Sequence, residues 1–392
     1  MDLELSQPQR DLQATAQRLA EDELRPHAAR WDEQEEFPER SLEAMAGSGL
    51  LGLTVPTAFG GQGAGVLEAC LVLEEFARGC LASAVVAQMF LNGPPRAIAT
   101  LGTPDQQQRY LPEVAAGRAY WGVAMTEPQA GSAGTELTTT LSRDGDRFRL
   151  DGQKWAITGG ARAEHFLVFC RAEGTSGPKG IGAVVVHRDA EGFAEPEIEP
   201  KMGSRGVAEA SLRFDGVAIS PDEVILTPDP ESKQGARMLL QQFNPERCGN
   251  AAMCIGVAQA ALDDSVSFTA EREQFGQPIA AFQGTQWRLA DMAVDIEAAR
   301  LLLWRAALTD EGGFPRTRET AMAKLVAGEM SQRVTNAAIQ LHGHRGYTRT
   351  RPIERYFRDV RGMALGGGTA EIMRNLIGAE VSGVRVSQRA SR

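Results

Sequence analysis

Three consecutive glycines, at positions 366–368, stand directly before a strong helix start in this 392-residue chain. Glycine has no side chain beyond a hydrogen atom, so a flat ligand can approach the backbone closely and accept hydrogen bonds from its N–H groups. Thr369 and Glu371 follow at positions that suit the first turn of a helix. The segment predicts a ligand-binding turn at a helix N-terminus.

A glutamate in the segment Asn244-Pro245-Glu246-Arg247 has the chemistry of a general base. In a dry pocket, burial raises a carboxyl pKa toward that of an activated carbon acid. The same segment also suits an ordinary helix start, with Asn244 as the N-cap, Pro245 in the first position and Glu246 in the first turn. The residues alone leave both interpretations of Glu246 open.

Four further motifs combine glycines with hydroxyls, amides and a cation, which suits a planar or anionic ligand. An arginine such as Arg272 can contact a pyrophosphate in a bidentate, charge-assisted way, although it equally suits a solvated helix C-terminus. The motifs are Gly122–Thr135, Lys154–Gly160, Arg272–Gln283 and Gln340–Tyr347.

Together with residues 358–374, these motifs follow the order and approximate spacing of the acyl-CoA dehydrogenase family, which the chain resembles over nearly its whole length. The resemblance implies FAD-dependent α,β-dehydrogenation of an acyl-CoA or acyl-carrier thioester to the trans-2-enoyl form. In that chemistry a carboxylate removes the α-proton, flavin N5 takes the β-hydride, and N–H donors stabilise the enolate.

The family usually places its base where this chain has Gly367. The Glu246-Arg247 pair resembles the isovaleryl and long-chain branches, in which the base stands at this earlier position and a small residue fills the usual one. The resemblance therefore implies Glu246 as the catalytic base and the Gly367 backbone N–H as an oxyanion donor. The residues that it places at the substrate are Ser132, Asn244, Arg247, Gly366 and Gly368.

The resemblance also implies which residues surround FAD, some of them reaching it across a subunit boundary. Ala156 stands where the family usually has Trp, Gly366 replaces a common aromatic residue, and His344 replaces a common Gly. The expected FAD contacts are Met125, Thr126, Ser132, Ala156, Thr158, Arg272, Gln274, Phe275, Phe282, Gln283, Gln340, Gly343, His344, Thr369 and Glu371.

A homotetramer, built as a dimer of dimers, and an electron-transfer flavoprotein as acceptor follow from the same resemblance. Two enzymatic alternatives use the same scaffold, namely a flavin-dependent monooxygenase and an enoyl reductase. A non-catalytic subunit of a hetero-oligomeric dehydrogenase is the alternative from another class, because the usual glutamate is missing at Gly367.

The elements that must position these residues fall into three segments. Apolar residues recur at helical spacing in residues 1–118, shorten toward a period of two between turns in 119–228, and return to helical spacing in 229–392. The sequence predicts a mainly α chain with an N-terminal α-helical domain, a middle antiparallel β-barrel-like domain and a C-terminal four-helix bundle.

Composition excludes several classes of partner. The net charge of −10 argues against nucleic acid. Five cysteines without metal-ligand spacing indicate reduced thiols, and His342 with His344 lacks companion ligands, so no metal is expected. No apolar run of about 18 residues occurs, and the acidic N-terminus does not resemble a signal peptide, so we expect no membrane association and a cytoplasmic location.

Overall fold

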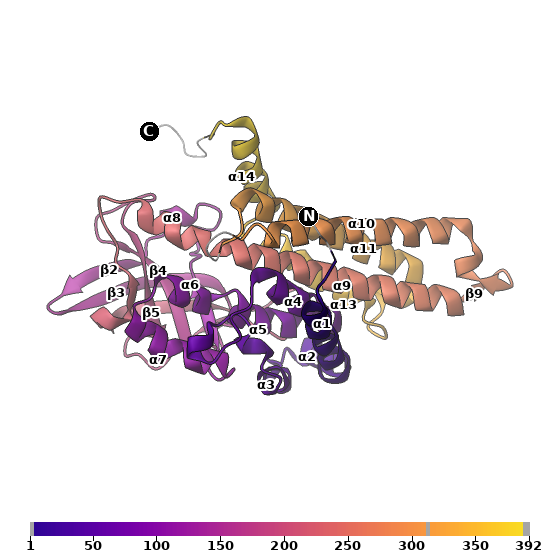
Figure 1. The fold of residues 1–392 in the computed structure, drawn as a ribbon, viewed down its shortest axis with the longest axis horizontal. Coiled ribbons are helices and arrows are strands. Elements are labelled where there is room, and N and C mark those ends of the chain that lie inside the picture. Colours follow the sequence, from indigo (N-terminus) through magenta and orange to yellow (C-terminus); the bar gives the residue numbers. More distant parts are fainter. Residues whose placement is uncertain (1–3, 311–313, 387–392) are drawn as a thin grey trace.

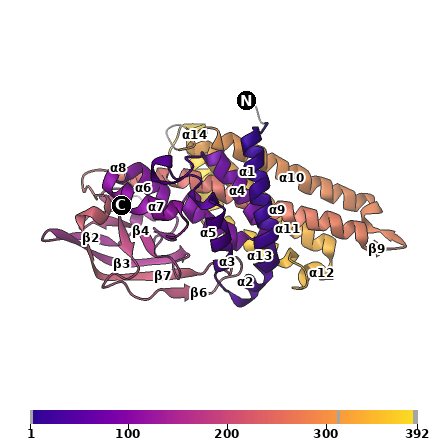
Figure 2. The ribbon, with the colours of Figure 1, turned by 60° about the horizontal axis from the view of Figure 1, so that its bottom comes forward.

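The computed structural model describes residues 4–310 and 314–386, and the elements run in the order helices, sheet, helices (Figures 1 and 2). The helix α7 begins with a capping box, because the Thr103 and Gln106 side chains each accept a hydrogen bond from the other residue's backbone N–H. The N-terminal helices are α1 Gln7–Leu19, α2 Ala28–Gln34, α3 Glu39–Gly47, α4 Val66–Gly79, α5 Leu81–Leu91, α6 Pro94–Leu101 and α7 Pro104–Ala115.

The middle of the chain forms one sheet with the strand order β6-β7-β3-β2-β4-β5-β8, to which β1 adds by pairing with β4. Most neighbours are antiparallel, as expected, but β4 pairs with both β1 and β2 in parallel. The sheet is therefore mixed, because β1 and β2 each reach β4 by a connection longer than a hairpin. The strands are β1 Trp121–Ala124, β2 Thr140–Asp144, β3 Arg147–Thr158, β4 His165–Ala172, β5 Ile181–His187, β6 Glu197–Glu199, β7 Glu209–Ile219 and β8 Val224–Leu226.

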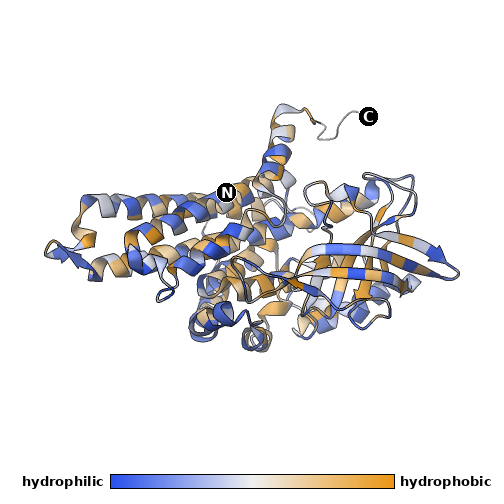
Figure 3. Cartoon of the chain, turned by 180° about the vertical axis from the view of Figure 1, so that it is seen from behind, coloured by the Kyte–Doolittle hydropathy of each residue, from blue (hydrophilic) through white to orange (hydrophobic). Residues whose placement is uncertain are grey.

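The C-terminal helices pack around α9, which has 29 residues and also contacts α4 of the N-terminal part. Small residues allow this close packing, since a Cβ atom at Gly256 would lie only 2.0 Å from the Glu74 carbonyl oxygen. Figure 3 shows hydrophobic and hydrophilic residues alternating along these long helices, as expected for helices with one buried face. The helices are α8 Gln234–Gln241, α9 Phe243–Glu271, α10 Gln283–Ala307, α11 Thr317–His342, α12 His344–Tyr347, α13 Ile353–Met363 and α14 Ala370–Ser382.

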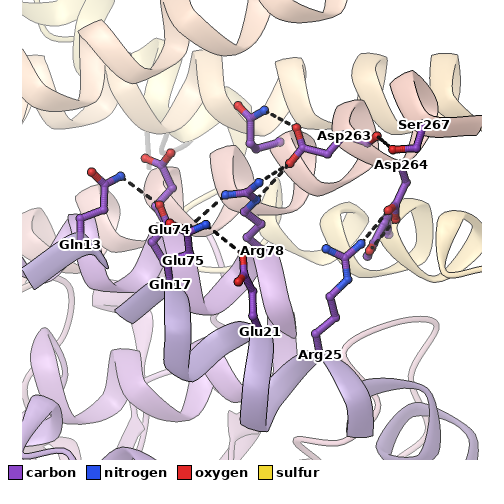
Figure 4. Close-up of polar contacts among 12 residues, drawn as sticks. Gln13, Gln17, Glu21, Arg25, Glu74, Glu75, Arg78, Asp263, Asp264 and Ser267 are labelled. Carbon is purple, nitrogen blue, oxygen red and sulfur yellow. Dashed lines mark hydrogen bonds and ion pairs between the residues drawn. The ribbon is translucent and has the colours of Figure 1, made fainter. Parts of the chain in front are cut away.

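A polar network joins the N-terminal helices to the C-terminal third of α9 (Figure 4). Arg78 pairs with Asp263 at 2.6 Å, and Arg25 pairs with the adjacent Asp264 at 2.6 Å. Because both aspartates lie on α9, these pairs fix how the N-terminal helices sit on the helix that also carries Glu246.

Candidate active site

The turn between α13 and α14 presents Gly367 to the start of α9. Gly367 and Gly368 have φ values of +66° and +100°, a backbone region that favours glycine. No described backbone group accepts a hydrogen bond from the Gly367 N–H, whereas the Gly366 N–H donates to the Gly362 carbonyl at 3.0 Å. The Gly367 N–H is therefore available as a donor to a ligand.

Glu246 lies directly against this turn. A Cβ atom built on Gly367 would stand 3.4 Å from Glu246 Oε1 and 2.5 Å from Asn250 Nδ2. The position at which the family usually carries its base and the position of Glu246 are therefore neighbours in space. A side chain at position 367 would clash with Asn250, whereas its Cβ atom would make an ordinary van der Waals contact with Glu246.

The helix-capping interpretation of this segment is wrong for Asn244. α9 begins at Phe243 and follows α8 almost without a break, so Asn244 is a helical residue and does not cap α9. Its amide donates to the Pro315 carbonyl at 3.0 Å and to Thr317 Oγ1 at 3.1 Å, and its oxygen accepts from Arg247 at 2.7 Å. The Asn244 amide has both of its donors occupied, so we expect it to orient Arg247 rather than to bind the substrate directly.

Two positively charged residues influence the pKa of Glu246, and both act against the effect of burial. Burial raises the pKa of Glu246 to about 7, against the lowering effect of Arg247 on the same helix and Lys324 on α11. Burial lowers the pKa of Lys324 to about 8. A carboxyl group that titrates near neutral pH is suited to general-base catalysis.

Three residues near Glu246 escaped the sequence analysis. The Gln88 side chain donates to the Glu246 carbonyl at 2.9 Å, and Lys324 Nζ donates to the Gly368 carbonyl at 2.6 Å. Asn250 follows Glu246 by one helical turn, so the spacing of four residues was a usable signal for it. Gln88 and Lys324 lie within other helices, and nothing local in the sequence marks them.

The two Gly-rich motifs of the middle domain meet at one edge of the sheet. The backbone N–H of Trp155 donates to the Thr126 carbonyl at 2.9 Å. This contact places Met125 and Thr126 beside the last residues of β3, which ends at Thr158. Below them a buried ion pair joins Glu127 to Lys154 at 2.8 Å. Ser132 is exposed in the loop that follows. The edge offers a hydroxyl, a thioether and backbone groups to a planar ligand.

A bulge in β3 determines the direction in which Trp155 points. The pairing of β3 with β7 changes register between Lys154 and Ile157, and Ala156 has a φ of +55°. Trp155 points its ring N–H to Glu199 Oε1 at 3.1 Å and is 43% exposed, so it does not take the place that the family gives to Trp. Bulges commonly re-aim side chains next to active sites.

The remaining expected FAD residues gather at the opposite end of the long helices, where β9 is labelled in Figure 1. Arg272 ends α9 and is exposed, and the hairpin of β9 Glu273–Gln274 with β10 Gln277–Pro278 leaves Phe275 95% exposed. The other residues of this far group are Gln274, Phe282, Gln283, Gln340, Gly343 and His344.

The far group fits the diphosphate and adenine of a dinucleotide by its chemistry. Among the described residues no hydrogen bond or ion pair involves the Arg272 guanidinium, and the Gln283 and Gln340 amides are exposed. A Cβ atom at Gly343 would meet nothing within 4 Å, so there is room for a ligand beside the backbone. A free guanidinium, free amides and an exposed aromatic ring suit a phosphate-bearing nucleotide.

Thr369 and Glu371 lie at the start of α14, away from the far group. The Thr369 side chain accepts a hydrogen bond from the Ile372 N–H at 3.3 Å, so it caps α14. Hydrogen bonds from its own backbone N–H and from Thr369 lower the pKa of Glu371. Both residues thus have a structural task at the turn that carries Gly367.

No group of three or more metal-ligating side chains comes together in the described part of the chain. Within residues 4–310 and 314–386, none of the helices is long and apolar enough to cross a membrane. All five cysteines are buried and free.

Comparison with known proteins identifies the family. Models of the N-terminal, middle and C-terminal domains of acyl-CoA dehydrogenases match residues 6–118, 122–217 and 233–382. The chain is 41% identical to 3-sulfinopropanoyl-CoA desulfinase of Paraburkholderia xenovorans, with 99% of each chain covered. It is 38% identical to acryloyl-CoA reductase (NADH) of Anaerotignum propionicum, covering 97% of this chain and 96% of the relative.

Among solved structures, butyryl-CoA dehydrogenase from Megasphaera elsdenii superposes with a TM-score of 0.93 at 30% identity, covering 97% of this chain and 100% of that one. The sequence comparisons and the structural superposition point to the same family and cover nearly the whole chain. The protein is a member of the acyl-CoA dehydrogenase family of FAD-binding oxidoreductases.

Proposed function

We propose that this enzyme oxidises an acyl thioester at its α,β-carbon bond, with Glu246 as the base that removes the α-proton. The observation that carries the proposal is the contact of Glu246 with the turn at Gly367, together with the burial that raises the pKa of Glu246 to about 7. Near neutral pH such a carboxylate can accept a proton from a carbon acid and afterwards release it to water.

The backbone of Gly367 supports the same reaction. Its N–H has no described backbone partner and lies beside the carboxylate, so it can donate to the thioester carbonyl oxygen while enolate charge develops there. Bound FAD supplies the hydride acceptor. Arg247 is oriented by Asn244 and adds a positive charge beside the base.

FAD is held, in this proposal, by residues from two subunits. Glu246 and Arg272 lie near opposite ends of α9, which at about 1.5 Å per residue places them about 39 Å apart. The far group around Arg272 therefore lies about one helix length from the end of α9 that carries Glu246, which supports the inference that it contacts the FAD of another copy. A second copy must bring its far group to the middle domain of the first.

The outer face of α10 supports self-association. Four large apolar residues, spaced seven apart, lie exposed along α10 and at its C-cap: Trp287, Val294, Leu301 and, at the C-cap, Leu308. Such a stripe at heptad spacing is typical of a helix that packs against another helix. We propose a homotetramer of two dimers, and an electron-transfer flavoprotein as the acceptor of the electrons.

Desulfination of 3-sulfinopropanoyl-CoA is a second candidate activity, favoured by the 41% identity to a protein of that name. The surroundings of Glu246 are polar enough for a charged acyl group, because Gln88, Arg247 and Asn250 are all buried beside it. Sulfite release from 3-sulfinopropanoyl-CoA without net electron transfer would support this activity over dehydrogenation.

The variant Glu246→Gln tests the proposed base. It keeps the size of the side chain but cannot accept the α-proton, so we expect it to bind FAD and thioester while flavin reduction slows by about 10²–10⁴-fold. The measurement is anaerobic stopped-flow reduction with a panel of saturated acyl-CoA thioesters. Wild-type speed in the variant would mean that Glu246 is not the base.

A further inference from the structure

Lys324 is a buried lysine that holds both ends of the turn around Gly367. Its Nζ atom donates to the Gly368 carbonyl at 2.6 Å and to the Met363 carbonyl at 3.3 Å. Met363 ends α13 and Gly368 precedes α14, so one ammonium group joins the two ends of the linker. Lys324 itself lies in the N-terminal third of the 26-residue helix α11.

Lys324 and Glu246 approach the same residue from two helices. A Cβ atom at Gly367 would lie 3.5 Å from Lys324 Cε and 3.4 Å from Glu246 Oε1. Among the described residues no carboxylate forms an ion pair with Lys324 within 4.0 Å, and its ammonium group donates to the two carbonyls. Its positive charge is therefore not neutralised by another partner and acts on Glu246.

The charged groups that act on these two side chains come from α9 and α11 alone. Glu246 is influenced by Arg247 of its own helix and by Lys324. Lys324 is influenced by Cys254, Arg247 and Glu246, all on α9. The neighbours from the other elements, Gln88 and Gly367, are uncharged. Among the described residues, Lys324 is thus the one cation from another element that lowers the pKa of Glu246 against the effect of burial.

We propose that Lys324 is a positioning residue for the base: its ammonium group fixes the turn that carries Gly367 and keeps the neighbouring Glu246 carboxylate ionised. This inference rests on the proposed role of Glu246. The pKa of Glu246 is about 7 and that of Lys324 is about 8. In the pH range between these two values, both side chains are mainly in their charged forms. Loss of the ammonium should raise the pH at which Glu246 loses its proton, because an opposite charge favours the ionised carboxylate.

The variants Lys324→Gln and Lys324→Arg separate charge from hydrogen bonding. Gln removes the charge and keeps an N–H donor for the Gly368 carbonyl, whereas Arg keeps the charge. We expect the midpoint of the rise in flavin reduction with pH to move up by about one unit in Lys324→Gln and to stay near the wild-type value in Lys324→Arg. The measurement is anaerobic flavin reduction by an acyl-CoA in the FAD-loaded enzyme between pH 5.5 and about 9.

Lys201→Met is the matched control. Lys201 is also a mostly buried lysine, with Glu209 at 3.7 Å as its ion-pair partner, and burial lowers its pKa. It lies outside the proposed site. Its removal should leave the midpoint unchanged even where it lowers the melting temperature.

A second readout needs no turnover. The infrared carboxyl band that Glu246→Gln removes reports the protonation of Glu246, and its pH titration should shift upward in Lys324→Gln. An unshifted band and an unshifted rate midpoint would overturn the inference. So would a Lys324→Gln protein that loses FAD while its infrared titration keeps the wild-type midpoint, since Lys324 would then be purely structural. If no thioester reduces wild-type flavin, the proposed function fails while the infrared titration still decides the role of Lys324.

Discussion

At the scale of single residues, Asn250 limits the space beside Gly367. A Cβ atom at Gly367 would lie 2.5 Å from Asn250 Nδ2, but 3.4 Å from Glu246 Oε1, which is an ordinary van der Waals contact. The backbone gives a second reason for glycine at position 367, because its φ of +66° disfavours any side chain. The close approach of Asn250 Nδ2 therefore disfavours a side chain at position 367 in this chain.

Moving the carboxylate back to the turn should fail unless Asn250 is made smaller. In Glu246→Gln with Gly367→Glu, the new Cβ atom would lie 2.5 Å from Asn250 Nδ2, so we expect lower stability and little recovery of flavin reduction. Adding Asn250→Gly should restore part of both. Melting temperature and single-turnover rate are the measurements, and full recovery without the change at Asn250 would contradict the packing.

Glu246 should also destabilise the fold above neutral pH. Its pKa is raised from 4.5 to about 7 in the folded state, so the folded chain binds a proton that the unfolded chain has already released. The stabilisation that the protonated Glu246 gives to the folded state is therefore fully present below pH 4.5 and is lost as pH rises through 7. We expect Glu246→Gln to gain on the order of 1–3 kcal/mol at pH 8 and nothing at pH 4.5, measured by urea unfolding. An equal gain at both pH values would point to another cause.

At the scale of elements, the bulge in β3 sets the edge of the middle domain. The register of β3 against β7 shifts at this point, and the Trp155 N–H there reaches the Thr126 carbonyl at 2.9 Å. Ala156 adopts a left-handed conformation that costs an alanine about 1 kcal/mol. The strand accepts this strain where its two Gly-rich loops meet, which is where the proposed flavin contacts lie.

Ala156→Gly should therefore stabilise the chain. Glycine adopts a φ of +55° without the steric cost, and we expect about 0.5–1 kcal/mol of added stability in the protein stripped of FAD. Ala210→Gly, on the paired strand β7 with ordinary backbone angles, is the control and should destabilise. A loss of stability in Ala156→Gly would show that the bulge is not strained.

At the scale of the whole molecule, the two groups of proposed FAD contacts lie at opposite ends of the long helices (Figure 1). The far group around Arg272 is exposed in one chain, and so is the apolar stripe along α10. Association would cover both surfaces at once and would complete the cofactor site. The division into domains at residues 1–118, 119–228 and 229–392 stays a prediction.

Arg272→Ala should weaken FAD retention. A guanidinium that contacts the diphosphate contributes about 1.5–3 kcal/mol, so FAD should leave the variant during dialysis that the wild type survives. Flavin absorbance per protein before and after dialysis is the measurement. Arg213→Ala, an exposed arginine on β7, should retain FAD fully. Equal retention in both variants would make Arg272 a surface residue.

Val294→Glu should break the assembly. Val294 is 68% exposed in the middle of the α10 stripe, and a buried unpaired charge between two helices is costly. We expect a smaller particle by light scattering and a loss of FAD. Ile198→Glu adds the same charge on the exposed strand β6 and should leave the particle mass unchanged. An unchanged mass for Val294→Glu would exclude the stripe as an interface.

The sequence by itself determined the three segments of the chain, which run in the order helices, sheet and helices. These depend on interactions within a few residues, such as apolar spacing and side-chain caps, which are visible in the linear chain. The family motifs were equally local, so the resemblance and its cofactor followed from them.

Only the tertiary structure decided which distant residues meet. It placed Glu246 against Gly367, put Lys324 beneath the same turn and left Asn244 inside a helix instead of capping it. It also made the sheet mixed at β4. Contacts between residues far apart in the chain depend on how whole helices and strands pack, and no local pattern specifies that packing.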